Sequence, residues 1–387
     1  MTQAASTNRL AGFPEALAAR QQAGAGDTFE ALHLFIDQEL RERGFQINRF
    51  SLGVETLHPV RSGTQLIMID GAFEERSNAT RAIVTTDSYL QSPTYVVDQT
   101  LKPFRWRRGE TTQSMGLLEA VQADGFTDYI IFPMPFLDAS RTATLSFATQ
   151  SPEGYSDQDI SDLEQAVALI SPYAERIGLR EISVNLLDTY VGRQSGERVM
   201  AGEIDRGVAT EIEAAVLMTD MRGFTRFTND ADAEVVLERL NRWFECVGTA
   251  VEAREGEILK FMGDGVLAIF LVSDTPQEAC GRAYAAASDI VAQVTALSEE
   301  TPELAFQIGI GLHIGHLAYG NVGSKSRLDF TVIGPTVNLA SRIETATKRL
   351  ERPILASKVF ADLLGDELKP IGTIEARGFN QPVAVYG

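Results

Sequence analysis

Residues 214–225 read AAVLMTDMRGFT, an apolar strand that ends at Asp220 and is followed by a turn containing Gly223. A carboxylate at a strand end, before a glycine turn, suits a metal–phosphate site, because the backbone N–H groups of the turn can face anionic oxygens. The pattern is weak by itself, because an aspartate at a strand end more often caps a helix or forms a turn. The next motifs along the chain decide between these interpretations.

Asp264 is the second carboxylate of this kind, in the segment KFMGDG at residues 260–265. Met-Gly-Asp-Gly between two apolar strands is typical of a tight hairpin, so Asp264 can be present for the turn alone. If the strands of Asp220 and Asp264 are neighbours, however, the two carboxylates converge. Two carboxylates with substrate phosphates are the usual ligands of Mg²⁺, and two such ions serve an in-line displacement at phosphorus.

Residues 329–342, DFTVIGPTVNLASR, form the third motif: a strand, a Gly-Pro break and a helix that begins near Pro335. Asn338 and Arg342 stand in an i, i+4 relation and therefore share one face of this helix. Arginine presents a planar fork to a phosphoryl oxygen, and asparagine offers both a donor and an acceptor. The alternative is an ordinary solvated pair on a helix surface.

Around these motifs, strands and helices alternate from Ala214 onward. Strands are expected near residues 214–220, 256–262, 265–271, 306–315 and 327–333, and helices near 232–253, 276–297 and 335–349. His313 and His316 are expected to be structural residues of a strand or its turn. Trp243 and Phe244 are expected to pack in the core or at a dimer interface.

Taken together, residues 211–387 resemble the class III nucleotidyl cyclase catalytic domain. The resemblance rests on five separated motifs in the family's order, namely TDMRGFT, KFMGDG, GLHIGHLAYGNVG, DFTVIGPTVNLASR and ARGFNQPVAVYG. It implies an α+β fold with a ferredoxin-like βαββαβ core. It also implies an adenylate cyclase, a phosphorus–oxygen lyase that converts ATP to 3′,5′-cyclic AMP and pyrophosphate.

The resemblance further implies a role for each matched position. The metal ligands are Asp220, Asp264 and the carbonyl of Met221, and the base-reading residues are Lys260 and Thr331. The phosphate-binding residues are Gly223, Phe224, Thr225 and Arg377. The catalytic residues are Asn338, which orients the ribose, and Arg342, which stabilises charge on the α-phosphate. Family members more often have lysine at the position of Arg377. Two Mg²⁺ or Mn²⁺ ions are expected in each site, one activating the ribose 3′-hydroxyl for in-line attack and one neutralising the pyrophosphate.

In this family the active sites form between two protomers of a head-to-tail homodimer. The metal ligands and base-reading residues come from one protomer, whereas the residues that match Asn338 and Arg342 come from the other. Because this chain carries both sets, two equivalent shared sites per dimer are expected.

The base-reading positions favour ATP. Lys260 can donate to N1 of adenine and Thr331 can accept from N6, whereas family members that make cyclic GMP commonly carry glutamate at the position of Lys260. Many members have aspartate at the position of Thr331, and the Lys/Thr pair resembles a bacterial subgroup that includes bicarbonate-responsive cyclases. Because lysine can also donate to O6 of guanine, a guanylate cyclase stays open as an alternative. A catalytically silent cyclase-like signalling module is a second alternative, and KFMGDGVL lacks the GG(D/E)EF pattern of diguanylate cyclases.

Residues 26–180 resemble the GAF-like regulatory domains, α/β sensors that precede proteobacterial cyclases. The likeness is carried by ETLHP, FRWRRGE, GFTDYIIFPMPF and LSFATQSPEGYSDQDISDLE. A helix from Phe29 to Leu40 is expected first. Short strands are expected at residues 47–57, 64–69, 129–134 and 142–149. A small-molecule ligand and a ligand-free dimerisation role are both open for this domain.

The flanking segments complete the organisation of the chain. Residues 1–25 are treated as a flexible tail in which a short helix is an open alternative, and residues 181–210 as a connector made of a helix and a transducer-like element. A long helix beginning near Ser156 carries an apolar stripe at Ile160, Leu163, Val167, Ile170, Ala174, Ile177 and Val184. The stripe indicates either a dimeric coiled coil or an amphipathic helix that covers its own sheet.

Two further features of the N-terminal half bear on the ligand that it could bind. Trp106 with Arg105, Arg107 and Arg108 could line an anion or cyclic-nucleotide pocket, but a solvated strand or loop is the stronger interpretation. The half contains no cysteine, which argues against a thioether-bound bilin or a cysteine adduct as its ligand.

The composition limits the classes of partner that the chain is expected to bind. The net charge of −19 argues against nucleic-acid binding and against docking on an anionic membrane, both of which need basic surfaces. Apolar runs such as residues 129–136 fall short of the roughly 20 residues that span a bilayer, and the N-terminus does not have the pattern of a signal peptide. Cys246 and Cys280 show no disulfide or zinc spacing. We therefore expect a cytoplasmic protein.

Overall fold

The computed structural model describes residues 8–22, 28–110, 115–137, 142–302, 305–376, 378–379 and 381–387. The chain divides into two compact units, Met1–Thr189 and Tyr190–Gly387. Among the described residues, no helix is long and apolar enough to cross a membrane.

The N-terminal unit is built around one antiparallel sheet. Its strands are β1 (Arg49–Glu55), β2 (Arg61–Ile69), β3 (Ala72–Thr80), β4 (Phe104–Arg107), β5 (Asp128–Pro135) and β6 (Thr142–Thr149), in the order β3-β2-β1-β6-β5-β4. Its helices are α1 (Phe13–Gln22), α2 (Phe29–Glu42), the 3₁₀ helix η1 (Arg81–Thr85), α3 (Asp87–Leu90), α4 (Pro93–Thr100), α5 (Gly116–Ala123) and α6 (Asp157–Val191). The predicted helix and four predicted strands are all present, whereas β3, β4, η1, α3, α4 and α5 were not predicted.

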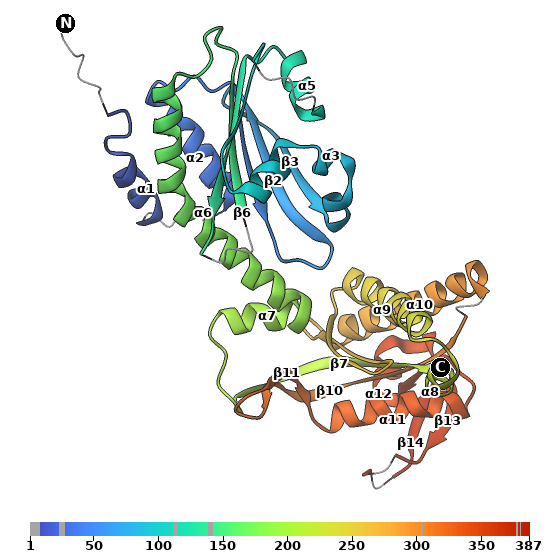
Figure 1. The fold of residues 1–387 in the computed structure, drawn as a ribbon. Helices are drawn as coiled ribbons and strands as arrows, with labels where there is room; N and C mark the ends of the chain where they lie inside the picture. The colour runs from blue at the N-terminus through green and yellow to red at the C-terminus, as the bar shows by residue number, and fades with distance from the viewer. Residues whose placement is uncertain are drawn as a thin grey trace, which may run out of the picture. The chain divides into compact units, whose positions relative to one another are not determined.

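Helices cover both faces of this sheet (Figure 1). One core joins α1, α2 and α6 to the face of Phe50, Phe132 and Phe147. The other joins α4 and α5 to the opposite face, where Trp106 and Tyr129 are buried. This alternation follows from the two-residue repeat of a strand, which sends Ile130 and Ile131 to different cores.

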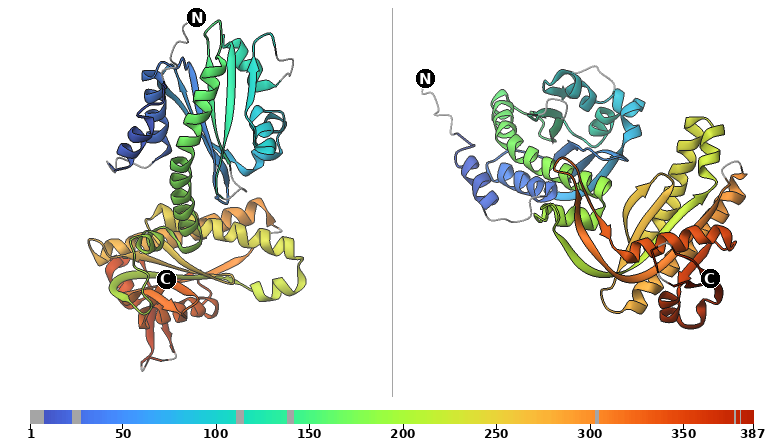
Figure 2. Two further views of the ribbon diagram at one scale, coloured as in Figure 1. Left: turned by 60° about the vertical axis from the view of Figure 1, so that its left-hand side comes forward. Right: turned by 90° about the horizontal axis from the view of Figure 1, so that it is seen from below.

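The stripe of α6 packs against its own sheet. Leu163, Val167, Ile170 and Ile177 are buried in the core that also contains α2, and Figure 2 (left) shows the green helix running along the strands. The amphipathic interpretation therefore holds for this part of α6, while Val184, the last member of the stripe, is 36% exposed.

Part of the segment treated as a flexible tail also packs. Residues 13–22 form α1, whose Phe13 and Leu17 are fully buried in the same core. Two large side chains a turn apart are enough to anchor a short helix, although they give too few repeats for a periodic signal. Residues 1–7 and 23–27 lie outside the described part.

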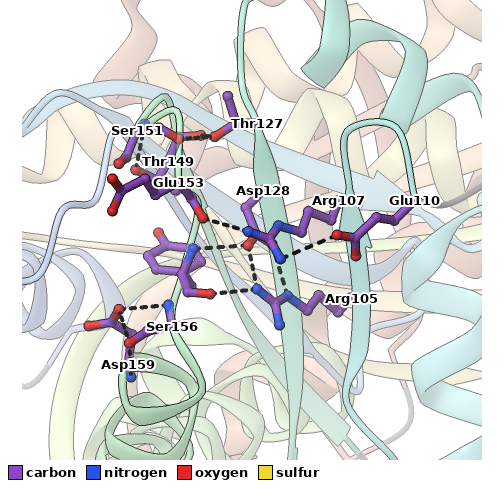
Figure 3. A network of polar contacts seen from close by, with 11 residues as sticks. Arg105, Arg107, Glu110, Thr127, Asp128, Thr149, Ser151, Glu153, Ser156 and Asp159 are labelled. Carbon is purple, nitrogen blue, oxygen red and sulfur yellow. Dashed lines mark hydrogen bonds and ion pairs between the residues drawn. The ribbon is translucent and has the colours of Figure 1, made fainter.

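Two of the arginines beside Trp106 are paired with carboxylates of their own unit. Arg105 donates to both carboxylate oxygens of the fully buried Asp128, at 3.1 and 2.6 Å (Figure 3), and the backbone N–H of Tyr155 donates to the same carboxylate. Arg107 pairs with Glu110 at 3.3 Å. The network closes the corner between β5 and the start of α6, so the charges of Arg105 and Arg107 are balanced within the unit, which favours the solvated-strand interpretation.

The C-terminal unit carries a second sheet. Its strands are β7 (Ala209–Arg222), β8 (Glu257–Met262), β9 (Gly265–Leu271), β10 (Gln307–Gly323), β11 (Leu328–Ile333), β12 (Ile354–Ser357), β13 (Pro370–Ile374) and β14 (Val383–Tyr386). Its helices are α7 (Arg193–Met200), α8 (Phe224–Asp230), α9 (Ala233–Ala253), α10 (Pro276–Glu300), α11 (Pro335–Arg349), α12 (Lys358–Leu364) and the 3₁₀ helix η3 (Gly365–Glu367). The predicted strands and helices after Ala214 are present; α8, α12 and β12 to β14 were not predicted.

The centre of this sheet has the order β10-β7-β9-β8, and β12, β14 and β13 extend it beyond β10. With α9 after β7 and α10 after the β8–β9 hairpin, the chain follows the βαββαβ sequence of elements. Helices α9 and α10 pack on one face, and α11 lies on the other (Figure 1). Backbone contact between α11 and β10 is close, because a Cβ at Gly311 would overlap the carbonyl of Ala340 and the N–H of Glu344.

Candidate active site

The two aspartates predicted to converge do so. Strand β7 pairs with β9, with Thr219 opposite Val266, and the β8–β9 turn closes with Met262 opposite Gly265. The hairpin therefore places Asp264 beside Asp220, and the two carboxyl groups lie within hydrogen-bonding reach. The turn is held from α9, where the indole N–H of Trp243 donates to the carbonyl of Asp264 at 2.7 Å. Sequence reasoning gave Trp243 only a packing role and missed this anchor.

The electrostatics of this pair suit a cation. Burial, the hydrogen bond and negative charge of Asp264, and the charge of Glu344 raise the pKa of Asp220 to about 7. Oδ1 of Asp220 is buried and accepts no hydrogen bond from the described residues. Ionising both carboxyls is thus unfavourable until a positive charge arrives, and carboxylate oxygens are the ligands that Mg²⁺ and Mn²⁺ prefer. The residues fit a divalent metal.

Two carboxylates do not complete a coordination sphere. In the described part of the chain, no three His, Cys, Asp or Glu side chains are grouped to hold a metal ion. Met221 buries its side chain, with 5% exposed, so its backbone carbonyl is the group left to offer a ligand. Remaining ligands would have to come from water or from a bound phosphate.

The turn after β7 matches its predicted shape. Gly223 has φ of +78°, a left-handed conformation that glycine adopts without strain, and it starts the short helix α8. Phe224 is half-buried against the core below α9, and Thr225 is exposed. Arg377, the fourth residue predicted to bind phosphate, lies outside the described residues.

The predicted base-reading residues come from neighbouring strands. Lys260 in β8 forms an ion pair with Asp329 in β11, with Nζ and Oδ2 2.6 Å apart. The hydrogen bond from Lys260 lowers the pKa of Asp329. Thr331 is buried and lies on the same face of β11 as Asp329, two residues away. Asp329 was missed from the sequence, although the two-residue repeat of the strand could have identified it.

Asn338 and Arg342 share an exposed face of α11, as predicted. Glu344 lies elsewhere on this helix: it sits over Gly309, which pairs with Asp220, and its charge acts on Asp220. Residues two apart on a helix point roughly 200° apart. Because Glu344 faces Asp220, Arg342 points away from the carboxylates of its own chain.

The two histidines of β10 have no place in this group. Nδ1 of His313 lies 2.7 Å from Oγ of Ser357, and burial lowers the pKa of His313 to about 4. The side chain of His316 is 70% exposed beside Glu211. Both agree with the structural role expected from the sequence.

Residues 209–382 match the family model of the adenylate and guanylate cyclase catalytic domain. Adenylate cyclase 1 of Rhizobium meliloti (strain 1021) is 29% identical over 256 residues, which are 63% of this chain and 38% of that protein. The adenylate cyclase of Anabaena cylindrica is 32% identical over 198 residues, 47% of this chain and 38% of that protein. The matches therefore span well under half the length of both relatives.

A solved structure of a bacterial light-regulated adenylyl cyclase is similar in fold. It is 18% identical, with a TM-score of 0.50, and the alignment covers 65% of this chain and 83% of that chain. The motifs, the paired carboxylates and the family match agree with one another. Residues 209–382 are therefore similar, in motifs and in fold, to the adenylate and guanylate cyclase catalytic domain.

Proposed function

We propose that this chain is an adenylate cyclase that converts ATP to 3′,5′-cyclic AMP and pyrophosphate. The observation that carries the proposal is the Asp220–Asp264 pair, in which a buried carboxylate oxygen has no donor among the described residues and burial beside a second carboxyl raises the pKa of Asp220. Such a pair of carboxyl groups destabilises the fold unless it binds a cation. Its presence therefore favours a functional role for the two aspartates over a structural one. Matches to two proteins named adenylate cyclase support the choice of reaction.

Asp220, Asp264 and the Met221 carbonyl would hold two Mg²⁺ or Mn²⁺ ions. When bound, these ions supply Lewis acidity that favours the ribose 3′-alkoxide and offsets charge on pyrophosphate. The turn at Gly223 would bind the β- and γ-phosphates through its N–H groups, with Phe224, Thr225 and Arg377 beside it. Catalysis then consists of positioning and electrostatics: Asn338 holds the ribose and Arg342 offsets charge at the α-phosphate.

The active unit is proposed to be a homodimer with two shared sites. Arg342 points away from the carboxylates of its own chain, so that one protomer alone supplies an incomplete site. A second copy in head-to-tail arrangement supplies the missing arginine, and the symmetry produces two equivalent sites.

ATP is the proposed substrate because of Lys260 and Thr331. The lysine offers a donor to N1 of adenine, and the Thr331 hydroxyl can accept from N6. Asp329 neutralises Lys260 and fixes the position of its ammonium group. GTP is the second candidate, since lysine can also donate to O6 of guanine.

The N-terminal unit is proposed to be a GAF-like regulatory domain acting in the cytoplasm. Its six-stranded antiparallel sheet with helices on both faces supports a sensor fold. A small-molecule ligand or dimerisation through α6 would change the relative rotation of the two catalytic domains. Because each site is shared, a small rotation would move Arg342 relative to the carboxylates.

The test is cyclic nucleotide formation by the purified chain, supplied with ATP or GTP in Mg²⁺ and in Mn²⁺. Cyclic AMP from ATP alone would agree with the proposal. Cyclic GMP as the main product would show that GTP, and not ATP, is the substrate. If no product appears from either nucleotide in either metal, and a fluorescent ATP analogue does not bind, the proposed function is wrong.

A further inference from the structure

A buried polar cluster lies beneath the proposed base-reading strands and outside the proposed active site. Ser195 of α7 donates to Oε1 of Glu257 in β8 through both its N–H and its hydroxyl, each at 2.8 Å. The hydroxyl of Tyr319 in β10 donates to Oε2 at 2.7 Å. The two hydroxyl oxygens lie 2.9 Å apart. One carboxylate thus ties together a helix and two strands.

The burial of this carboxylate requires an explanation. Glu257 is 6% exposed and Ser195 is fully buried, next to a core of apolar side chains that includes Leu317 and Phe330. Burying a charge is costly even when it is hydrogen-bonded, and an apolar side chain of similar size is often as stable. A buried charge of this kind adds directional hydrogen bonds, which fix the position of its strand more closely than apolar contacts do.

Two routes lead from the cluster to the base-reading residues. The first runs along β8, where the pairing with β9 shifts register between Ile258 and Lys260. A strand with such an irregularity bends locally, so the direction of Lys260 depends on how the strand is held at Glu257.

The second route runs through the aromatic rings. Tyr319 contacts Phe330 edge to face, with ring centroids 4.9 Å apart, and Phe330 directly precedes Thr331. Arg198 of α7 lies over both rings, 4.8 Å from the centroid of Tyr319 and 5.1 Å from that of Phe330. The Lys260–Asp329 ion pair then connects β11 back to β8. Cluster, rings and ion pair form one closed circuit of contacts.

We propose that Glu257 and Tyr319, held by Ser195 of α7, are positioning residues for the base-reading side chains Lys260 and Thr331. The inference rests on the proposed function and adds a structural basis for regulation at the same site. Since α7 directly follows α6 in the chain, a displacement of α7 alters the hydrogen bonds of Glu257 and so the geometry presented to the base. The phosphate-binding turn and the metal ligands lie outside this circuit and keep their geometry.

The test compares Glu257→Gln and Tyr319→Phe with the wild-type full-length chain. Both substitutions keep the shape of the side chain and remove a hydrogen-bonding group. Tyr284→Phe and Ser288→Ala in α10, on the opposite face of the sheet, are the matched controls. Circular dichroism and thermal melts establish folding, and if Glu257→Gln fails to fold, Tyr319→Phe carries the test.

Two affinities separate positioning from a general structural effect. The first is the Kd of an ATP analogue with a fluorescent label on the ribose, and the second is the Kd of inorganic tripolyphosphate, measured by competition. We expect each cluster variant to raise the Kd of the ATP analogue about 3- to 10-fold, as for loss of one hydrogen-bonded contact, with unchanged tripolyphosphate affinity. The preference for ATP over GTP should fall by a similar factor, and the controls should match the wild type.

Three outcomes overturn the inference. Unchanged ATP-analogue affinity and nucleotide preference in folded Glu257→Gln and Tyr319→Phe would show that the cluster serves stability alone. Equal losses for the ATP analogue and for tripolyphosphate would show a general disturbance. A wild-type chain that binds no nucleotide would overturn the proposed function and this inference with it. If the wild-type chain binds nucleotide, the variants test the positioning role separately from the proposed function.

Discussion

Each unit of the molecule holds an aspartate on its sheet, but the two carboxylates are treated in opposite ways. In the N-terminal unit, Asp128 is fully buried and accepts two hydrogen bonds from Arg105 and one from the N–H of Tyr155. In the C-terminal unit, Asp220 lies against another carboxyl, and its buried Oδ1 accepts no hydrogen bond from the described residues.

The difference separates a structural carboxylate from a functional one. A buried charge whose donors all come from its own chain stabilises a corner of the fold and has nothing left to bind. A carboxylate that lies against a second carboxyl and keeps one buried oxygen without a donor destabilises the free protein and is suited to bind a cation. The same residue type therefore has predictable and opposite responses to substitution in the two units.

Asp220→Ala is expected to have the largest effect on activity and little or none on folding. Loss of a metal ligand should lower cyclic nucleotide formation by at least about 1,000-fold, in line with the loss of a principal source of transition-state stabilisation. Folding raises the pKa of Asp220, so the contribution of Asp220 to the free energy of unfolding is fully present below pH 4, where the side chain is protonated in both states. This contribution is lost as the pH rises through about 7 and the folded chain has to carry the ionised carboxylate. At pH 8 the variant should therefore melt at or above the wild-type temperature. A clearly lower melting temperature would make Asp220 a structural residue like Asp128.

Mixing of inactive variants sharpens the comparison, because the partners of Asp128 lie in its own chain and one partner of Asp220 should lie in a second copy. Asp220→Ala and Arg342→Ala should each be inactive alone. Random exchange into heterodimers should restore about a quarter of wild-type activity, since half the dimers carry one intact site of two. Continued inactivity of heterodimers isolated with two affinity tags would contradict the shared site.

Asp128→Asn should destabilise the N-terminal unit by about 3 kcal/mol, because it removes the fully buried carboxylate that balances the charge of Arg105, whose side chain is 28% exposed. The chain has two tryptophans, and Trp106 belongs to this unit. Urea unfolding of a Trp243→Phe background, followed by Trp106 fluorescence, measures the change. Arg107→Gln is the control, since Arg107 pairs with a more exposed glutamate, Glu110. Equal stability of Asp128→Asn and its background would show that Asp128 does not stabilise the N-terminal unit.

The sequence predicted the local geometry of the candidate residues better than the elements around them. The KFMGDG hairpin and the shared face of Asn338 and Arg342 depend on local rules of turns and helices, which a sequence displays directly. Strands such as β12 and β14 span four residues each, too few for a periodic signal, and they form because neighbouring strands are already in place. Pairings between distant residues, including Lys260 with Asp329 and Ser195 with Glu257, depend on strand order.

Helix α7 illustrates the same limit. Gly192, Gly196 and Gly202 interrupt the apolar periodicity of the connector, and Gly196 is unfavourable inside a helix. The helix forms nevertheless, because Ser195 is fixed by Glu257 and Val199 packs against the core below β8 and β10. Tertiary contacts of this kind override the low helix propensity of the local sequence, and they cannot be predicted before the fold is known.

A smaller difference between the units should appear in acid. Burial lowers the pKa of His33, which stacks on Phe50 at 4.3 Å, to about 4. The unfolded chain therefore binds this proton near pH 6.5 while the folded unit does not, so stability is full above pH 6.5 and falls as the pH drops toward 4. At pH 5 the loss from His33 is about 2 kcal/mol. His33→Phe should remove this part of the pH dependence, giving a flatter plot of unfolding free energy for the N-terminal unit between pH 7 and 5. The measurement is urea unfolding followed by Trp106 fluorescence, and parallel plots for the variant and its parent would show that His33 does not control the acid sensitivity of this unit.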